Sequence, residues 1–141
     1  MHEGGRIQIG AGVQILQDSW LIVECKDEMD IGENVFISQH CTVSGSVRIG
    51  KDTLIAGFVS IIDAHHTFKS TDIPIREQGG VKRPICIGKD VWIGTMSVVL
   101  AGVTIGDGAV IGANTTVTHD IPPRAIAVGC PARIVGWRGG T

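Results

Sequence analysis

Aliphatic residues recur every six positions along most of the chain. The series runs from residue 9 to residue 117 with two interruptions, four extra residues after residue 21 and twenty after residue 61. All fifteen positions hold Ile, Leu or Val, although these three types make up only 39 of the 141 residues. The positions are Ile9, Ile15, Leu21, Ile31, Ile37, Val43, Ile49, Ile55, Ile61, Ile87, Ile93, Val99, Ile105, Ile111 and Val117. Self-similarity at a fixed period is typical of a repeat architecture.

Three of these hexapeptides form a longer unit of eighteen residues. Every third aliphatic position is an Ile followed by Gly, at Gly10, Gly32, Gly50, Gly88 and Gly106. A period of six fits neither an α-helix nor an antiparallel hairpin. It fits a solenoid of short parallel strands in which Gly relieves backbone crowding at corners. We therefore predict an all-β, three-sided parallel β-helix of about five coils, with the aliphatic side chains pointing inward.

The residue four positions after each aliphatic one is predicted to fill the remaining interior. These residues are mostly small or β-branched. They are Val13, Ser19, Cys25, Val35, Cys41, Val47, Thr53, Val59, Val91, Ser97, Val103, Ala109 and Thr115.

Two segments depart from the repeat. Residues 66–84 are polar and are expected to leave the β-helix as a loop, and long loops on a compact scaffold are usually functional. Pro122 and Pro123 are expected to end the solenoid because proline cannot donate to a strand ladder. We expect a single domain over residues 1–141, with coils at 9–65 and 87–122 and a tail at 123–141.

Composition and charge argue against several classes of protein. Twelve Lys and Arg against fourteen Asp and Glu give a net charge of −2, which disfavours a nucleic-acid-binding protein with a basic face. No apolar run reaches the roughly 18 residues of a membrane span, and the first residues do not resemble a signal peptide. No C-x-x-C pair is present, so the cysteines are interpreted as small buried hydrophobes in a reducing compartment, which favours a cytoplasmic protein. They are Cys25, Cys41, Cys86 and Cys130.

Three stretches of the sequence resemble the hexapeptide-repeat acyltransferases, in particular the maltose, galactoside and polysaccharide O-acetyltransferases. They read IGKDVWIGTMSVVLAGVTIGDGAVIGANTTVTHDIPP at 87–123, AVGCPARIV at 127–135 and VSIIDAHH at 59–66. The resemblance implies a left-handed β-helix and transfer of an acetyl group from acetyl-CoA to a hydroxyl of a saccharide-type acceptor. It also implies a homotrimer with active sites in the clefts between subunits. Apolar residues predicted to face outward, such as Phe58, Trp92 and Met96, agree with an assembly.

The resemblance identifies His65 as the general base. His65 lies where the coil ends and the loop begins. Histidine suits this chemistry because its ordinary pKa is about 6.5. His66 is the alternative, since some relatives space the motif by one residue. Asp63 is close enough in sequence to orient an imidazole.

A column of residues is the predicted groove for coenzyme A. Gln39, Gly57, Thr95 and Ala113 are each third in the second hexapeptide of a coil. Three of them are small and would leave an open edge whose backbone amides can bond a pantetheine arm. By resemblance, the coenzyme A contacts are Thr95, Ala113, Thr118 and Arg133, with Thr95 near the thioester oxygen and Arg133 at the phosphates.

Other positions bear on the acceptor and on the nucleotide. His40 stands where relatives that acetylate sugars often carry an acceptor-binding Asn, and Gln39 and Trp92 lie beside the same predicted groove. By resemblance, His119 replaces a Lys that is usual in relatives, and a neutral His would lose a phosphate contact at the nucleotide end of the groove. The acceptor is left open between a saccharide chain, a lipid-linked sugar and a nucleotide sugar, and O-acetylation is favoured over N-acetylation by resemblance alone.

Two other functions are compatible with such a solenoid. A γ-class carbonic anhydrase needs three histidines around one zinc ion, two of them spaced His-x4-His. The histidines His2, His40, His65, His66 and His119 contain no such pair, so no metal is expected. A non-catalytic assembly or regulatory module is the other alternative.

Overall fold

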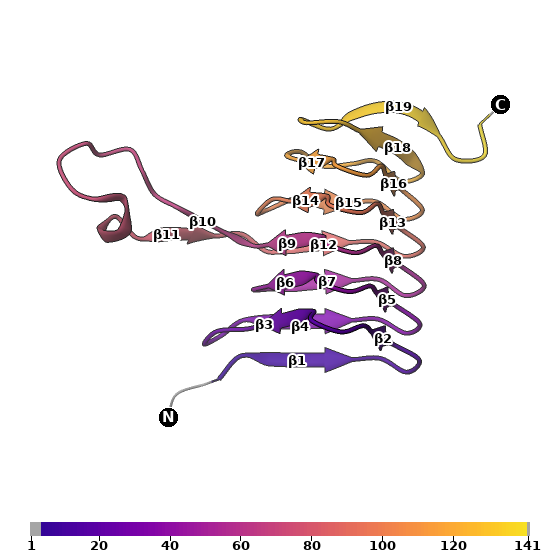
Figure 1. The fold of residues 1–141 in the computed structure, drawn as a ribbon, viewed down its shortest axis with the longest axis horizontal. Coiled ribbons are helices and arrows are strands. Elements are labelled where there is room, and N and C mark those ends of the chain that lie inside the picture. Colours follow the sequence, from indigo (N-terminus) through magenta and orange to yellow (C-terminus); the bar gives the residue numbers. More distant parts are fainter. Residues whose placement is uncertain (1–3, 141) are drawn as a thin grey trace.

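The computed structural model describes residues 4–140 and shows a three-sided parallel β-helix with an arm projecting from its middle (Figure 1). Its five stacked coils confirm the predicted fold class. His2 lies outside the described residues.

Each side of the β-helix is a parallel sheet to which every coil contributes one strand. Sheet A contains β1 (Arg6–Ile9), β4 (Glu28–Ile31), β7 (Val47–Ile49), β12 (Ile85–Ile87) and β15 (Thr104–Ile105). Sheet B contains β2 (Gln14–Ile15), β5 (Phe36–Ile37), β8 (Leu54–Ile55), β13 (Trp92–Ile93) and β16 (Val110–Ile111). Sheet C contains β3 (Trp20–Ile22), β6 (Thr42–Ser44), β9 (Ser60–Ile62), β14 (Val98–Val99) and β17 (Thr116–Val117).

The corners between the sheets are stacked like the strands. The B–C corner comprises residues 16–19, 38–41, 56–59, 94–97 and 112–115, and the C–A corner joins sheet C of each coil to sheet A of the next. Gly of the Ile-Gly pairs lies at the A–B corner. A Cβ at Gly50 would lie 2.5 Å from the carbonyl carbon of Gly88, so Gly allows the close approach of successive coils that the sequence predicts.

The core is a column of aliphatic side chains inside the coils. Twelve of the fifteen predicted positions are at most 2% exposed, those from Ile31 to Val117. The three positions in coil 1 differ: Ile9 is 50% exposed, Ile15 is 36% exposed and Leu21 is half-buried. Full burial needs cover on both sides: the tail covers coil 5, whereas in the described chain coil 1 has a neighbour on one side only.

The insertion forms an arm that begins two residues earlier than predicted. Strand β10 (Ala64–His66) pairs antiparallel with β11 (Gly80–Lys82), and a short 3-10 helix, η1 (Ile75–Glu77), lies near the tip. The third hexapeptide of coil 3 therefore ends at Ile62, and His65 belongs to the base of the arm.

The C-terminal tail continues sheet B, so the prediction that Pro122 and Pro123 end the solenoid is wrong. Strand β18 (Ala125–Val128) pairs parallel with β16, and β19 (Arg133–Trp137) pairs antiparallel with β18. The ladder here uses the amides of Ile121 and Arg124, which donate to coil 5. The equivalent amides in lower coils donate to the next coil above, as that of Gly88 does to Ile105. The prolines are tolerated because no further coil lies above them in the described chain.

The prediction that the cysteines are buried is correct only for Cys41. Burial raises the pKa of its thiol. Cys25, Cys86 and Cys130 are exposed. Cys86 alternates with two inward-facing Ile residues of β12 and therefore lies on the outer face of sheet A.

Candidate active site

The predicted groove column exists as a stack on the B–C corner. The amide of Met96 donates to the carbonyl of Gly57 at 3.0 Å, and the amide of Asn114 donates to the carbonyl of Thr95 at 2.9 Å. These bonds set Gly57, Thr95 and Ala113 one above another in successive coils.

Only the upper part of this column is open. Gly57 is buried, and the side-chain amide carbon of Gln39 would lie 3.5 Å from a Cβ at Gly57. Thr95 and Ala113 are exposed. Within residues 4–140, the backbone amides of Thr95 and Ala113 donate to no protein acceptor, so both are available to a ligand.

The hydroxyl of Thr95 is already engaged. It donates to the carbonyl of Gly57 at 2.7 Å, and a hydroxyl has a single proton to donate. The donor that Thr95 keeps free is therefore its backbone amide.

His65 and His66 are consecutive residues of β10 on the arm. His65 pairs with Val81 and His66 with Gly80, and both imidazoles are exposed. Asp63 is buried, and its carboxylate accepts the amide of Ser46 at 2.8 Å. Among the described residues no hydrogen bond joins Asp63 to either imidazole, so Asp63 holds the C–A corner of the coil.

His65 and the open B–C corner lie beyond opposite ends of the strands of sheet C. Strand β9 leaves the B–C corner at Val59 and ends at Ile62, after which the arm carries His65 away from the coils (Figure 1). Thr95 and Ala113 stay on the B–C corner. A single chain therefore does not bring the predicted base to the predicted groove.

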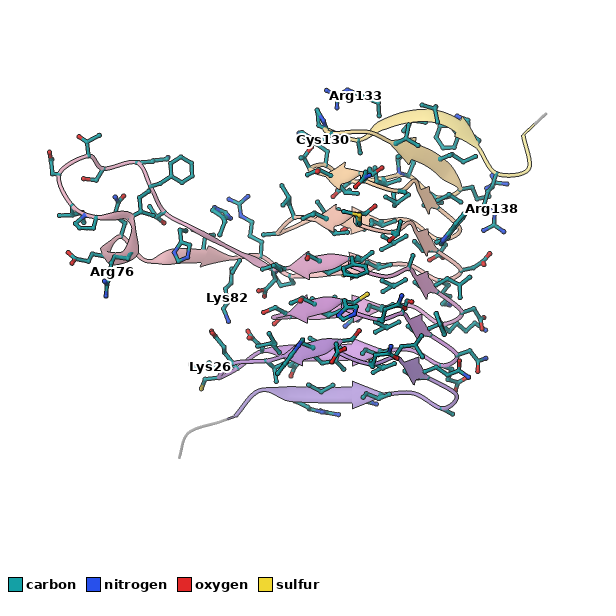
Figure 2. The ribbon with its side chains drawn as sticks, viewed as in Figure 1. Lys26, Arg76, Lys82, Cys130, Arg133 and Arg138 are labelled. Carbon is teal, nitrogen blue, oxygen red and sulfur yellow. The ribbon has the colours of Figure 1, made fainter. Side chains whose placement is uncertain are left out.

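The remaining predicted coenzyme A contacts lie near the C-terminal end of the β-helix, Thr118 after β17 of sheet C and Arg133 at the start of β19 in sheet B. The Thr118 hydroxyl and the Nδ1 atom of His119 are 2.9 Å apart and share a hydrogen bond. The amide of Ala132 donates to the carbonyl of Thr116, which fixes the tail on coil 5 beside Arg133. The guanidinium of Arg133 is exposed at this end of the molecule (Figure 2).

Of the predicted acceptor residues, His40 and Gln39 lie lower on the B–C corner, where His40 belongs to a stacked ring pair. The rings of His40 and Phe58 stack with centroids 4.8 Å apart, and the Nδ1 atom of His40 lies 3.9 Å from the Asp18 carboxylate. Gln39 is half-buried and accepts the hydroxyl of Ser38. His40 and Phe58 are eighteen residues apart, so the repeat that stacks successive coils also stacks these two rings.

Trp92 faces outward, as the register predicts, and is 54% exposed on sheet B. Its strand neighbours are Leu54, 51% exposed, and Val110. Phe58 and Met96 at the adjoining corner are also more than half exposed. Side chains of this size form an apolar surface on sheet B and its corner.

A charged cluster at the base of the arm was not predicted. The ammonium of Lys82 lies 3.0 and 2.9 Å from the two carboxylate oxygens of Asp27 and 3.0 Å from a carboxylate oxygen of Glu24. The hydrogen bonds to Asp27 and Glu24 raise the pKa of Lys82. Burial alone raises the pKa of Asp27, but hydrogen bonds from the Glu24 amide and Lys82 outweigh it, so the pKa is lowered.

Residues 4–140 contain neither a metal-binding cluster nor a membrane-spanning helix. No three His, Cys, Asp or Glu side chains in this range gather closely enough to hold a metal ion. The range also contains no helix with the length and hydrophobicity needed to cross a membrane.

Comparisons of sequence relate the chain to acetyltransferases. The family described as "Bacterial transferase hexapeptide (six repeats)" matches residues 87–119. A galactoside O-acetyltransferase of Escherichia coli K12 is 40% identical over 108 residues, which cover 74% of this chain and 52% of that protein. A probable acetyltransferase of Mycobacterium tuberculosis is 35% identical over 135 residues, 94% of this chain and 45% of that protein. The chain thus spans about half the length of these curated relatives.

Solved structures give the same relationship, and this chain covers a larger share of them than of the curated relatives. A hexapeptide-repeat acetyltransferase of Vibrio cholerae is 30% identical, with a TM-score of 0.81 over 94% of this chain and 74% of that one. The same enzyme complexed with acetyl coenzyme A also gives a TM-score of 0.81, at 29% identity, over 94% of this chain and 72% of that one. With the repeat, the coil stacking and these relatives in agreement, the chain belongs to the hexapeptide-repeat acetyltransferases.

Proposed function

We propose that this protein is an acetyl-CoA-dependent O-acetyltransferase that modifies a hydroxyl of a saccharide-type acceptor. The observation that carries the proposal is the match of 94% of the chain to a hexapeptide-repeat acetyltransferase crystallised with acetyl coenzyme A. The name of the Escherichia coli relative, a galactoside O-acetyltransferase, supports a sugar hydroxyl as the acceptor.

In this proposal the pantetheine arm of acetyl-CoA lies along the B–C corner. The free amides of Thr95 and Ala113 bind it, and the Thr95 amide stabilises the negative charge that develops on the thioester oxygen. Thr118 and Arg133 contact the distal part of the coenzyme, where the planar fork of Arg133 suits a phosphate.

His65 acts as the base in the proposed reaction. Its imidazole accepts the proton of the acceptor hydroxyl while the hydroxyl oxygen forms a bond to the thioester carbonyl carbon. The carbon–sulfur bond then breaks, and the imidazolium returns the proton to the departing thiolate, which gives coenzyme A and the acetyl ester. His40 and Gln39 contact the acceptor, and Trp92 flanks the groove.

The proposed enzyme is a homotrimer with its active sites between subunits. The separation of His65 from Thr95 and Ala113 across sheet C supports this arrangement, because a neighbouring copy can supply the missing half. The exposed apolar surface at Leu54 and Trp92 also favours association.

A release assay tests the activity. Purified protein is mixed with acetyl-CoA and a panel of sugars, nucleotide sugars and serine, and free thiol is measured. His65→Ala should lower turnover by about 10² to 10⁴, and His66→Ala should change it little. No release with any acceptor would favour the non-catalytic assembly module, and full activity in both variants and their double variant would remove the histidine mechanism.

Complementation between subunits tests the arrangement. His65→Ala and Ala113→Trp should each be inactive, because one lacks the base and the other fills the groove. Random co-assembly of equal amounts should restore about a quarter of wild-type activity. Each active site takes its base from one subunit and its groove from the next, and each half is intact with a probability of about one half. No recovery in demonstrably mixed trimers would place both halves in one subunit and refute the proposal.

A further inference from the structure

The tip of the arm is held together by its own hydrogen bonds. The side-chain amide of Gln78 donates to the carbonyls of Ser70 and Ile73, and its carbonyl oxygen accepts the amide of Ser70. These bonds close the tip around η1. The direction of the whole arm is therefore set where β10 and β11 leave the coils (Figure 1).

One side chain connects the base of the arm to the coils. Lys82, the last residue of β11, points towards the turn between β3 and β4 that also carries Lys26 (Figure 2). Its ammonium contacts both carboxylate oxygens of Asp27 and one of Glu24. Within residues 64–82, no other side chain forms a hydrogen bond or ion pair with the coils.

The Asp27 carboxylate that accepts this contact is buried and held by hydrogen bonds within its own turn. Asp27 is only 5% exposed, and its Oδ2 atom also accepts the amide of Glu24 at 2.8 Å. The amide of Asp27 in turn donates to the Glu24 carbonyl, so bonds that do not involve Lys82 close the turn. A carboxylate held this firmly gives Lys82 a fixed point of attachment.

The tether acts on the strands that carry the histidines. Lys82 pairs with Ala64, and its neighbour Val81 pairs with His65. A change in the angle of β11 therefore moves His65 with it. Displacement by about 1 Å of a group near the reacting atoms can lower a rate by roughly 10²-fold.

We infer that Lys82, held by Asp27 and Glu24, is a positioning residue that fixes the direction of the arm and so the place of His65. This inference rests on the proposed function for its kinetic consequence. The structural tether can be tested without any activity.

Hydrogen exchange of the intact protein tests the tether. Lys82→Met should accelerate exchange of the amides in β10 and β11 at least about fivefold, while amides of the coils keep wild-type rates. Lys69→Met is the matched control, because Lys69 lies on the same arm, is exposed and forms no ion pair among the described residues. Lys82→Arg should restore slow exchange, since it keeps the charge. Unchanged exchange in Lys82→Met would overturn the inference.

Kinetics test the consequence for His65. Lys82→Met should lower kcat by about tenfold or more and leave the KM for acetyl-CoA within about twofold, because the coenzyme groove lies on another corner. Lys69→Met should match the wild type, and Lys82→Arg should recover most of kcat. A wild-type kcat in Lys82→Met, alongside an inactive His65→Ala, would refute the positioning role and leave the proposed function standing. An inactive wild type with accelerated exchange in Lys82→Met would refute the proposed function and leave the tether standing.

Discussion

The stacking of coils predicts that one substitution has very different effects in two coils. Ile93 and Ile15 occupy the same place in sheet B, on β13 and β2. Ile93 is fully buried between Ile55 and Ile111, whereas Ile15 is 36% exposed at the end of the described β-helix. Replacement of each by Ala removes three carbon atoms.

The expected losses follow from burial. For Ile93→Ala, loss of three buried carbons at about 0.8 kcal/mol each gives about 2.4 kcal/mol, and the cavity raises the total to about 3 to 4 kcal/mol. For Ile15→Ala, about two thirds of the transfer energy is lost, roughly 1.5 kcal/mol, and the space stays open to water. The two variants should therefore differ by about 2 kcal/mol in the free energy of unfolding.

Urea titration followed by circular dichroism measures the difference. At an m-value of about 2 kcal/mol per M, the midpoint of Ile93→Ala should lie about 1 M below that of Ile15→Ala. Both variants need the same protein concentration, because any assembly adds a concentration-dependent term. Equal losses would refute the reasoning that a coil on each side sets the cost of the substitution.

Three further predictions concern the groove, the corners and the tether. Ala113→Trp should abolish binding of acetyl-CoA in calorimetry with a normal Tm, whereas Ala11→Trp, at an exposed position on another corner, should bind normally. Gly50→Ala should lower stability by about 1 to 3 kcal/mol because its Cβ meets the backbone of coil 4, and Gly4→Ala, with open space around it, should be neutral in the same melt. Because folding lowers the pKa of Asp27, its charge stabilises the fold above the unfolded value of about 3.9 and stops doing so as the pH falls through the lower folded value. The Tm gap between wild type and Asp27→Asn should therefore persist at neutral pH and close below about pH 4; a gap that widens in acid would contradict the sign.

The repeat allowed the sequence to determine the coils. Neighbouring strands in a sheet come from positions a fixed number of residues apart, so the spacing of the repeat predicts the pairing of Ile93 with Ile111. The Ile-Gly pairs reveal the A–B corner in the same way. The stack of Thr95 on Gly57 also follows, because it obeys the same offset across the insertion.

The sequence could not determine which of those stacked groups remain available to a ligand. Gln39 folding over Gly57, and the Thr95 hydroxyl bonding to the Gly57 carbonyl, depend on side-chain rotamers and not on the repeat. The same limit applies to Asp63, whose carboxylate turns inward to the amide of Ser46. A residue type and its spacing indicate a place, whereas the hydrogen bonds there depend on what surrounds it.

Contacts outside the repeat were decided only by the tertiary structure. Lys82 meets Asp27 across 55 residues, with the arm on one side and a turn of coil 1 on the other, and no periodic signal links the two. The strands after Pro122 continue sheet B because the top of coil 5 offers unpaired backbone groups. The sequence therefore determined the β-helix, because a regular period repeats one local solution, and the tertiary structure decided the arm, the tether and the tail, because each forms once.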